Sequence, residues 1–208
     1  MFLSKLVLDA RHPQVRKEMV NRYELHRTIS SAFSGDARPE IGLLYRLEIS
    51  PQLNSPLLLV QSLISPDWTA LHEKGCLVCP AEVKHFEPQF SAGQIFIFRL
   101  VANPTVRKKQ EQGESNRVGL YKEQQQIDWL SRKAIDGGFK LIEVRALQQG
   151  VQQFEKRKDR KAHKVQNLSV CFEGRLQVVD VELFQKTFCR GIGSAKGFGF
   201  GLLSLARS

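Results

Sequence analysis

The stretch EPQFSAGQIFIFRLV, residues 87–101, decides how the chain is divided. Its first seven residues include Pro88 and end in Ser91, Ala92 and Gly93, a composition typical of a linker. In the next eight residues, 94–101, the side chains alternate between two apolar faces, which predicts a strand. A domain therefore ends near residue 87, and a second one begins at residue 94.

The same order of elements is predicted on both sides of this linker. Before it, we expect strands and helices in the order strand, helix, strand, strand, helix, strand at 2–8, 24–33, 43–49, 57–63, 67–72 and 77–84. After it, that order returns at 94–101, 122–135, 139–147, 168–179, 180–188 and 198–205, with a polar loop at 107–116. This order predicts an α+β fold of two tandem ferredoxin-like (βαββαβ) domains, 1–87 and 94–208. The alternative is one continuous α+β domain with a larger sheet.

The charge of the chain is unevenly distributed. Lys and Arg number 31 against 21 Asp and Glu, a net charge of +10 over 208 residues. Residues 1–93 carry 10 basic and 10 acidic side chains, so the whole excess lies in 94–208. A one-sided basic field favours a polyanion such as nucleic acid. No apolar run reaches the roughly 18 residues that span a bilayer, so we expect a soluble cytoplasmic protein without a membrane partner.

Two segments of the second half fit contacts with phosphate. Residues 156–164 hold six Lys and Arg in nine positions between two predicted strands, which predicts a basic hairpin. Residues 191–201 contain five glycines and Lys196, and glycine lets backbone N–H groups approach a phosphate closely. The ordinary interpretations are a solvated loop and a tight turn. The glycine segment matches neither the Walker A phosphate-binding loop nor the glycine-rich fingerprint of dinucleotide-binding domains.

The predicted helix at 24–33 and the residues flanking it carry groups suited to RNA cleavage. Tyr23, His26, Arg27 and Ser34 fall on or near one side, opposite a row of apolar residues. Metal-free RNA cleavage needs two proton transfers and stabilisation of a charged phosphorane, and histidine titrates near neutral pH. A tyrosine three residues before a histidine is more often a surface pair without a role.

A metal site is the competing interpretation of the cysteines. Cys76 and Cys79 form a CxxC between His72 and His85, but no second CxxC follows and the spacing matches no zinc finger or ribbon. We therefore expect no metal and no cofactor.

Several strings resemble the CasE family, the CRISPR repeat-RNA endoribonucleases of the Cascade complex. They are MFLSKL at 1–6, NRYELHRT at 21–28, FRLVANP at 98–104, CFEGRL at 171–176, and GIGSAK at 191–196 running into GLLSL at 201–205. The resemblance covers nearly the whole chain. It implies tandem ferredoxin-like domains and an enzyme that binds the repeat stem-loop and cuts at the 3′ base of the stem without metal. The cut, by 2′-hydroxyl attack, would leave a 5′-hydroxyl and a 2′,3′-cyclic phosphate, and the enzyme would stay bound beside the other Cascade subunits.

The resemblance also implies roles for individual residues. His26 would be the catalytic histidine and Tyr23 its partner. The residues expected to contact RNA are Arg27 and Ser34 near the helix, Arg157, Lys158 and Lys161 in the basic hairpin, and Lys196 in the glycine segment. Two rivals remain: a non-catalytic RNA-binding subunit of a guide ribonucleoprotein, and a metal-dependent nuclease, which would need clustered carboxylates.

Overall fold

The structure is a computed structural model whose chain divides into two compact units. Unit 1 contains Met1–Pro88, Phe154–Val165 and Lys196–Gly199, and unit 2 contains the remaining segments. The structure describes residues 1–33, 41–50, 54–109, 115–158 and 161–207. At 108–109, 115–116, 154–158 and 161–165 the description covers the backbone alone.

Unit 1 contains the first four-stranded antiparallel sheet. Its elements are β1 (Phe2–Val7), α1 (Pro13–Val20), α2 (Arg22–Ser30), β2 (Leu44–Ser50), β3 (Ser55–Ser62), α3 (Thr69–Glu73), β4 (Glu82–His85) and the 3-10 helix η2 (Lys196–Phe198). The strand order β2-β3-β1-β4 is that of a ferredoxin-like domain. All pairs are antiparallel, and β1 lies between β3 and β4 because it is paired to both.

The core of unit 1 lies between this sheet and α2. Leu6 of β1, Tyr45 of β2 and Leu58 of β3 lie on the same face of the sheet, and each is at most 1% exposed. Leu25 and Ile29 of α2 join them, four residues apart and therefore on one side of the helix. Burial of apolar side chains stabilises a domain by about 25 cal/mol for each Å² of apolar surface that is removed from water. The core therefore holds α2 in a fixed rotation on the sheet.

Unit 2 contains the second four-stranded sheet. Its elements are β5 (Ile95–Ala102), β6 (Thr105–Lys109), β7 (Ser115–Gly119), α4 (Glu123–Asp136), most of β8 (Phe139–Lys158) and β9 (Lys161–Val178), α5 (Val181–Arg190) and β10 (Leu203–Arg207). The adjoining ends of β8 and β9, within Phe154–Val165, belong to unit 1. The order β10-β5-β9-β8 repeats that of the first sheet. Trp129 of α4 stacks on Phe172 of β9, and Phe184 of α5 packs against Phe139 of β8. The predicted α+β fold with two ferredoxin-like domains is confirmed.

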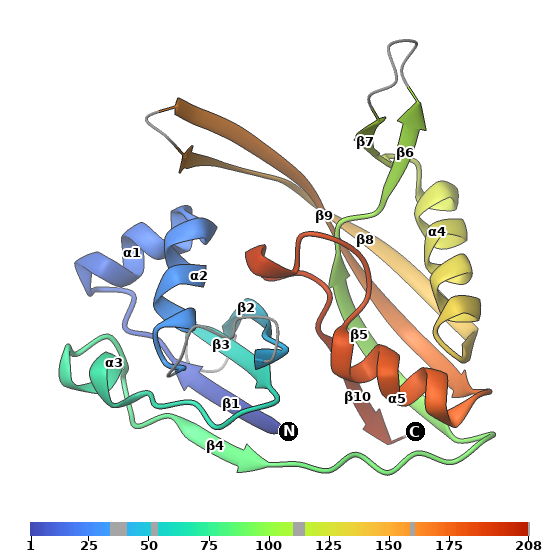
Figure 1. Ribbon diagram of the computed structural model, residues 1–208, viewed down its shortest axis with the longest axis horizontal. Coiled ribbons are helices and arrows are strands. Elements are labelled where there is room, and N and C mark those ends of the chain that lie inside the picture. The colour runs from blue at the N-terminus through green and yellow to red at the C-terminus, as the bar shows by residue number, and fades with distance from the viewer. Residues whose placement is uncertain (34–40, 51–53, 110–114, 159–160, 208) are drawn as a thin grey trace. The chain divides into compact units, whose positions relative to one another are not determined.

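The predicted loop at 107–116 is wrong at its two ends, which are strands, and its middle, 110–114, lies outside the described residues. Strands β6 and β7 pair there as a separate antiparallel ribbon, with Val106 opposite Val118 and Arg107 opposite Arg117 (Figure 1). This ribbon, called the β6–β7 arm below, is anchored at its base, because Leu120 N–H donates a hydrogen bond to Pro104 O at 3.0 Å. The buried Gln126 side chain donates to Leu120 O at 2.9 Å. The sequence of β6 and β7 did not predict strands, because charged residues have a low strand propensity.

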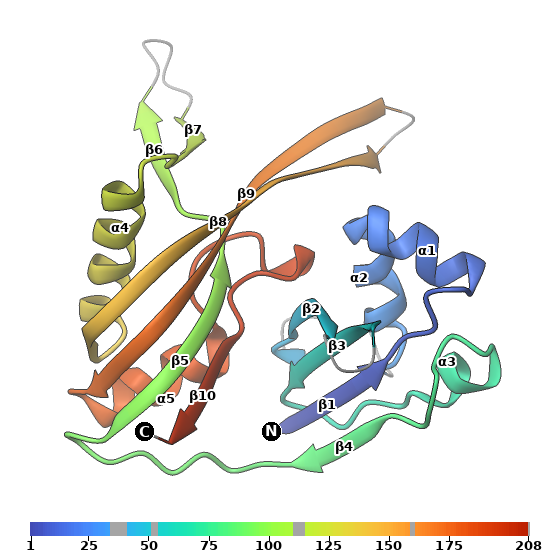
Figure 2. The ribbon, with the colours of Figure 1, turned by 180° about the vertical axis from the view of Figure 1, so that it is seen from behind.

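The boundaries of several other strands also differ from the predicted ones. The strand expected at 77–84 shortens to β4, and Leu77 forms only an isolated bridge with Leu8. The last strand begins at Leu203, because the glycines before it hold turns and η2. The strands around the basic hairpin are longer than predicted and form the extended β8–β9 pair (Figure 2). Within the described residues, none of the helices has the length and hydropathy that crossing a bilayer demands.

Candidate active site

Helix α2 carries the two residues predicted for catalysis. Its first turn is capped by Asn21, whose side chain accepts a hydrogen bond from the Tyr23 N–H at 3.1 Å. Such a cap stabilises a helix by about 1 kcal/mol. Tyr23 and His26 are both half-buried and stand three residues apart, at the border between the buried side of the helix and the solvent. The predicted pairing of these two side chains on one helix is therefore compatible with the fold.

His26 is held between a tyrosine ring and a glycine. Its imidazole stacks on Tyr45 of β2, with ring centroids 6.2 Å apart and planes inclined by 17°. Atom Nδ1 of His26 is covered by protein. On the Nε2 side lies Gly197, where a methyl group would sit 3.5 Å from Nε2. A glycine at this position leaves one flank of Nε2 without a side chain.

Tyr45 connects three segments of unit 1. Its side chain is 0% exposed, and its hydroxyl lies 3.0 Å from Gly197 O and 3.4 Å from Arg22 O. Burial raises the pKa of this phenol well above its ordinary value, although the charge of Arg22 opposes the shift. Tyr45 is therefore a hydrogen-bond donor at every physiological pH.

The glycine segment has the backbone shape that its sequence requires. Ala195 has φ +62° and Gly199 has φ +89°, so both lie in the left-handed region. A methyl group at Gly199 would meet Tyr45 Cε2 at 3.1 Å. Between these two residues, Lys196 opens η2, which contacts both α2 and β2. The structure thus places η2, which begins at Lys196, against the helix that carries His26, and the predicted contact of Lys196 with phosphate stays a prediction.

Two arginines of α2 differ in their surroundings. Arg27, predicted to contact RNA, is exposed and forms an ion pair with Glu24 at 3.2 Å. Arg22 is half-buried, and its atom Nη1 is covered and has no hydrogen-bond partner in the described part of the chain. Desolvation lowers the pKa of Arg22. Arg22 precedes His26 by one helical turn, so it places a poorly solvated positive charge at this end of α2.

Four of the residues predicted to contact RNA are described incompletely. Ser34 lies outside the described residues. Arg157 and Lys158 end β8, and Lys161 begins β9, but the description there covers the backbone alone. Strands β8 and β9 are neighbours in the sheet, residues 159–160 between them lie outside the described residues, and the contacts of these basic side chains stay a prediction.

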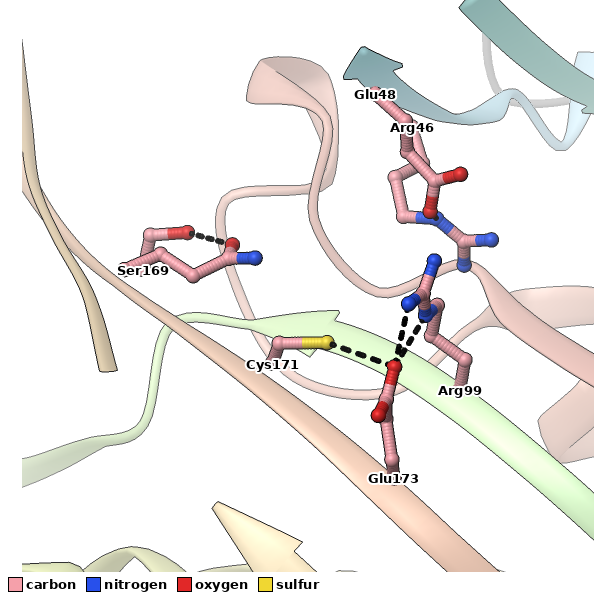
Figure 3. A network of polar contacts seen from close by, with 7 residues as sticks. Arg46, Glu48, Arg99, Ser169, Cys171 and Glu173 are labelled. Atoms are coloured by element: carbon pink, nitrogen blue, oxygen red, sulfur yellow. Dashed lines mark hydrogen bonds and ion pairs between the residues drawn. The ribbon is translucent and has the colours of Figure 1, made fainter. Parts of the chain in front are cut away.

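Some basic side chains of unit 2 are paired with carboxylates of the same unit. On its sheet, Glu173 accepts from Arg99 at 2.6 Å and from the Cys171 thiol at 3.9 Å, and Ser169 donates to Gln149 at 3.1 Å (Figure 3). In unit 1, Arg46 is bonded to Glu48 in the same way, at 2.6 Å.

The β6–β7 arm is arranged differently. There, the exposed Arg107 and Arg117 stand directly opposite each other in the ladder. Like charges in opposed positions destabilise a ribbon, so this pair favours an anionic ligand.

The cysteines do not gather with the two histidines of the competing metal hypothesis. The Cys76 thiol is buried, and it lies 3.6 Å from Nδ1 of His12. Burial raises the pKa of that thiol, with Glu18 adding to the effect. Across the described residues, no group of three or more His, Cys, Asp and Glu side chains is placed to hold a metal ion.

The arrangement around His26 is suited to proton transfer beside a backbone that can approach a phosphate. Nδ1 of His26 is covered by protein, and Nε2 borders the position that a Gly197 side chain would take. The sequence singled out His26, Tyr23 and Lys196, whose roles stay predictions, and did not single out Tyr45, whose ring stacks on His26. The tyrosine lies on a strand 19 residues after His26, with no local pattern that links it to the helix.

The chain is similar to proteins of one family along its whole length. A family model described as "CRISPR associated protein" matches residues 1–207. A relative named "CRISPR-associated endoribonuclease Cse3", from Thermus thermophilus, is 40% identical over 99% of this chain and 100% of its own length. Another, "CRISPR system Cascade subunit CasE" from Escherichia coli, is 31% identical over 99% of both chains.

Solved structures show the same similarity. The endoribonuclease Cse3 bound to a 19 nt RNA has a TM-score of 0.85 and 39% identity, over 99% of this chain and 100% of that one. Thermus thermophilus Cse3 bound to an RNA representing a pre-cleavage complex has a TM-score of 0.80 and 38% identity, over 99% and 98%. Cas6e from Escherichia coli has a TM-score of 0.74 and 30% identity, over 100% of both chains.

Proposed function

Because the chain belongs to the CasE and Cse3 family of CRISPR-associated proteins, we propose that it is the endoribonuclease that processes CRISPR repeat RNA. In this proposal it binds the stem-loop of each repeat and cuts the precursor transcript at the 3′ base of the stem. The chemistry is attack of the 2′-hydroxyl on the adjacent phosphorus, which leaves a 2′,3′-cyclic phosphate and a 5′-hydroxyl.

The observation that carries the proposal is the environment of His26. Its Nδ1 is covered, and its Nε2 faces the side-chain-free flank of Gly197. Nε2 is therefore the atom that exchanges a proton with the RNA, either from the 2′-hydroxyl or to the departing 5′-oxygen. Histidine suits both steps because its ordinary pKa lies close to neutral pH.

The remaining roles follow from charge and position. Tyr23, one turn before His26, orients the scissile nucleotide, because a phenol is a poor base at neutral pH. The phosphorane is stabilised by nearby cations, for which Lys196 at the start of η2 is the described candidate. Arg27 contacts the backbone by releasing Glu24, while Arg157, Lys158 and Lys161 of the hairpin grip the stem together with Ser34 near α2.

The cleavage proceeds without a metal ion in this proposal. A two-metal or one-metal nuclease positions its ions with clustered carboxylates and histidines. The described residues form no such donor set, whereas the groups around His26 supply proton transfer directly.

The proposal extends to domains, partner and location. We assign residues 1–87 to a catalytic domain and residues 94–208 to a basic RNA-binding domain, in keeping with the ten-charge excess of the second half. The enzyme stays bound to its product as a subunit of Cascade, the complex that appears in the name of the Escherichia coli relative. It acts in the cytoplasm, where the transcript is made.

The test is incubation with a stem-loop repeat RNA in excess EDTA, with the same RNA carrying a 2′-deoxy nucleotide at the scissile position as control. We expect full cleavage of the first RNA and no cleavage of the second. Products should resist ligation at the cyclic phosphate and accept labelling at the new 5′-hydroxyl. Cleavage that needs a divalent ion, or that survives the 2′-deoxy substitution, would contradict the mechanism. Tight binding of both RNAs with no cut in either would favour a non-catalytic RNA-binding subunit.

A further inference from the structure

We propose that Tyr45 is the positioning residue of the active site: its ring supports the His26 imidazole and holds the segment Gly197–Gly199 beside that imidazole. The inference rests on the proposed endoribonuclease function and goes beyond it. Tyr45 lies outside the Tyr23 and His26 pair that sequence and family resemblance indicate. It reaches the reaction through two other residues and does not itself touch the scissile phosphate.

The first support is the stacking of the two rings. Their planes are inclined by only 17°, with centroids 6.2 Å apart, so the phenol ring limits the rotation of His26 about its side-chain bonds. Tyr45 is itself held in place, because it is 0% exposed and its strand, β2, pairs with β3, where Val60 stands opposite it. A platform on a strand positions a side chain more accurately than one on a loop.

The second support is the contact of the same ring with the glycine segment. A methyl group at Gly199 would lie 3.1 Å from Cε2 of Tyr45, closer than such atoms normally approach. Glycine is also required there by its φ of +89°. The backbone at Gly199 therefore packs against the Tyr45 ring, and this contact fixes the distance between the segment Gly197–Gly199 and the sheet.

The third support is the hydroxyl. Tyr45 has one O–H proton and two carbonyl neighbours, Gly197 O at 3.0 Å and Arg22 O at 3.4 Å. The shorter contact has the normal length for a hydrogen bond, so the proton is donated to Gly197. This bond joins positions 152 residues apart and fixes the residue that flanks Nε2 of His26.

These contacts explain how a loop and a helix from opposite ends of the chain share one geometry. Without the ring, His26 gains rotamers and the glycine segment loses its support. Catalysis is sensitive to such changes, because misplacement of a group by about 1 Å can lower a rate about 100-fold. Since burial keeps the hydroxyl protonated, Tyr45 does not compete with His26 for the proton of the reaction.

The test compares three variants of the full-length protein. Tyr45→Leu removes the ring, and Tyr45→Phe removes only the hydroxyl. Leu58→Ala is the matched control: Leu58 is 1% exposed in the same core and pairs with Leu47 and Leu6. For each variant we measure the single-turnover cleavage rate, the Kd for a non-cleavable 2′-deoxy stem-loop, and the melting temperature. The ring carbon and proton resonances of His26 are recorded by NMR in the absence of RNA.

For Tyr45→Leu we expect a rate at least about tenfold lower, an unchanged Kd, and His26 resonances shifted toward those of a rotating imidazole. Tyr45→Phe should retain the wild-type resonances and lose no more than about fivefold in rate, as expected for one neutral hydrogen bond. Leu58→Ala should melt earlier but cut at the wild-type rate below its melting temperature.

The inference is overturned if Tyr45→Leu cuts as fast as the wild type, or no more slowly than Leu58→Ala. Unchanged His26 resonances in Tyr45→Leu would overturn it as well. A wild-type protein that binds the stem-loop but never cuts it would refute the proposed function instead. The NMR comparison would then still decide whether Tyr45 positions His26.

Discussion

The substitution Gly199→Ala is expected to lower cleavage sharply, and its effect can be estimated from the backbone. Residue 199 has φ +89°, where an L-residue with a Cβ is strained by about 1 to 2 kcal/mol. In addition, the new methyl group would stand 3.1 Å from Cε2 of Tyr45, which forces one of the two to move by a few tenths of an ångström. Because Tyr45 is buried in the sheet, the glycine segment is the part that moves.

The matched control is Gly75→Ala in the turn after α3. Gly75 also has a left-handed φ, +71°, but a methyl group there would meet nothing within 4 Å. We therefore expect Gly75→Ala to change the rate by less than about threefold, and Gly199→Ala to lower it by about tenfold or more, in keeping with 1 to 2 kcal/mol.

The assay is single-turnover cleavage of a labelled stem-loop RNA at saturating protein, with the Kd measured separately. The RNA affinity should change little for either variant. Equal rates for Gly199→Ala and Gly75→Ala would refute the reasoning, because both positions have a left-handed backbone and only a methyl group at residue 199 meets Tyr45.

Two further predictions concern stability. The Arg11 guanidinium, and after it the Arg11 backbone N–H, hold the pKa of Asp9 at about 2, below its unfolded value near 4. This carboxylate therefore stabilises the fold above about pH 4, and the effect disappears as the pH falls through about 2. Urea unfolding of Asp9→Asn and wild type should therefore show a gap that is constant at neutral pH and closes toward pH 2; a gap independent of pH would refute the linkage. In unit 2, Asn103 donates to Asn167 at 2.8 Å in a buried pair, so Asn103→Leu alone should cost about 1 to 3 kcal/mol by stranding the partner amide. Adding Asn167→Leu should recover much of that loss in the same urea experiment, and a double variant less stable than the single one would contradict this explanation.

Local pattern predicted the elements that contain regular apolar spacing. The alternation in 94–101 was confirmed as β5, and the apolar row of Leu25 and Ile29 was confirmed as the buried side of α2. Both signals arise from residues close in sequence that share one face. For the same reason the linker and the repeated element order were sufficient to predict two ferredoxin-like sheets.

Features that depend on distant contacts or on charged strands were not predictable in this way. The β6–β7 arm pairs Arg107 with Arg117, and nothing in the apolar pattern marks such a ribbon. The position of Tyr45 depends on Gly197 and Gly199, which follow it by more than 150 residues. Only the folded chain shows that this glycine segment lies against α2 and β2.

The central claim is that Nε2 of His26 transfers a proton during RNA cleavage. The most direct measurement compares His26→Ala with wild type in one experiment, as the single-turnover cleavage rate of a stem-loop RNA in EDTA and the Kd for its 2′-deoxy form. The account predicts a rate about 10² to 10⁴ times lower with a Kd within about threefold. A variant that cuts at the wild-type rate, or that loses binding in proportion to cleavage, would show that His26 is not the catalytic group.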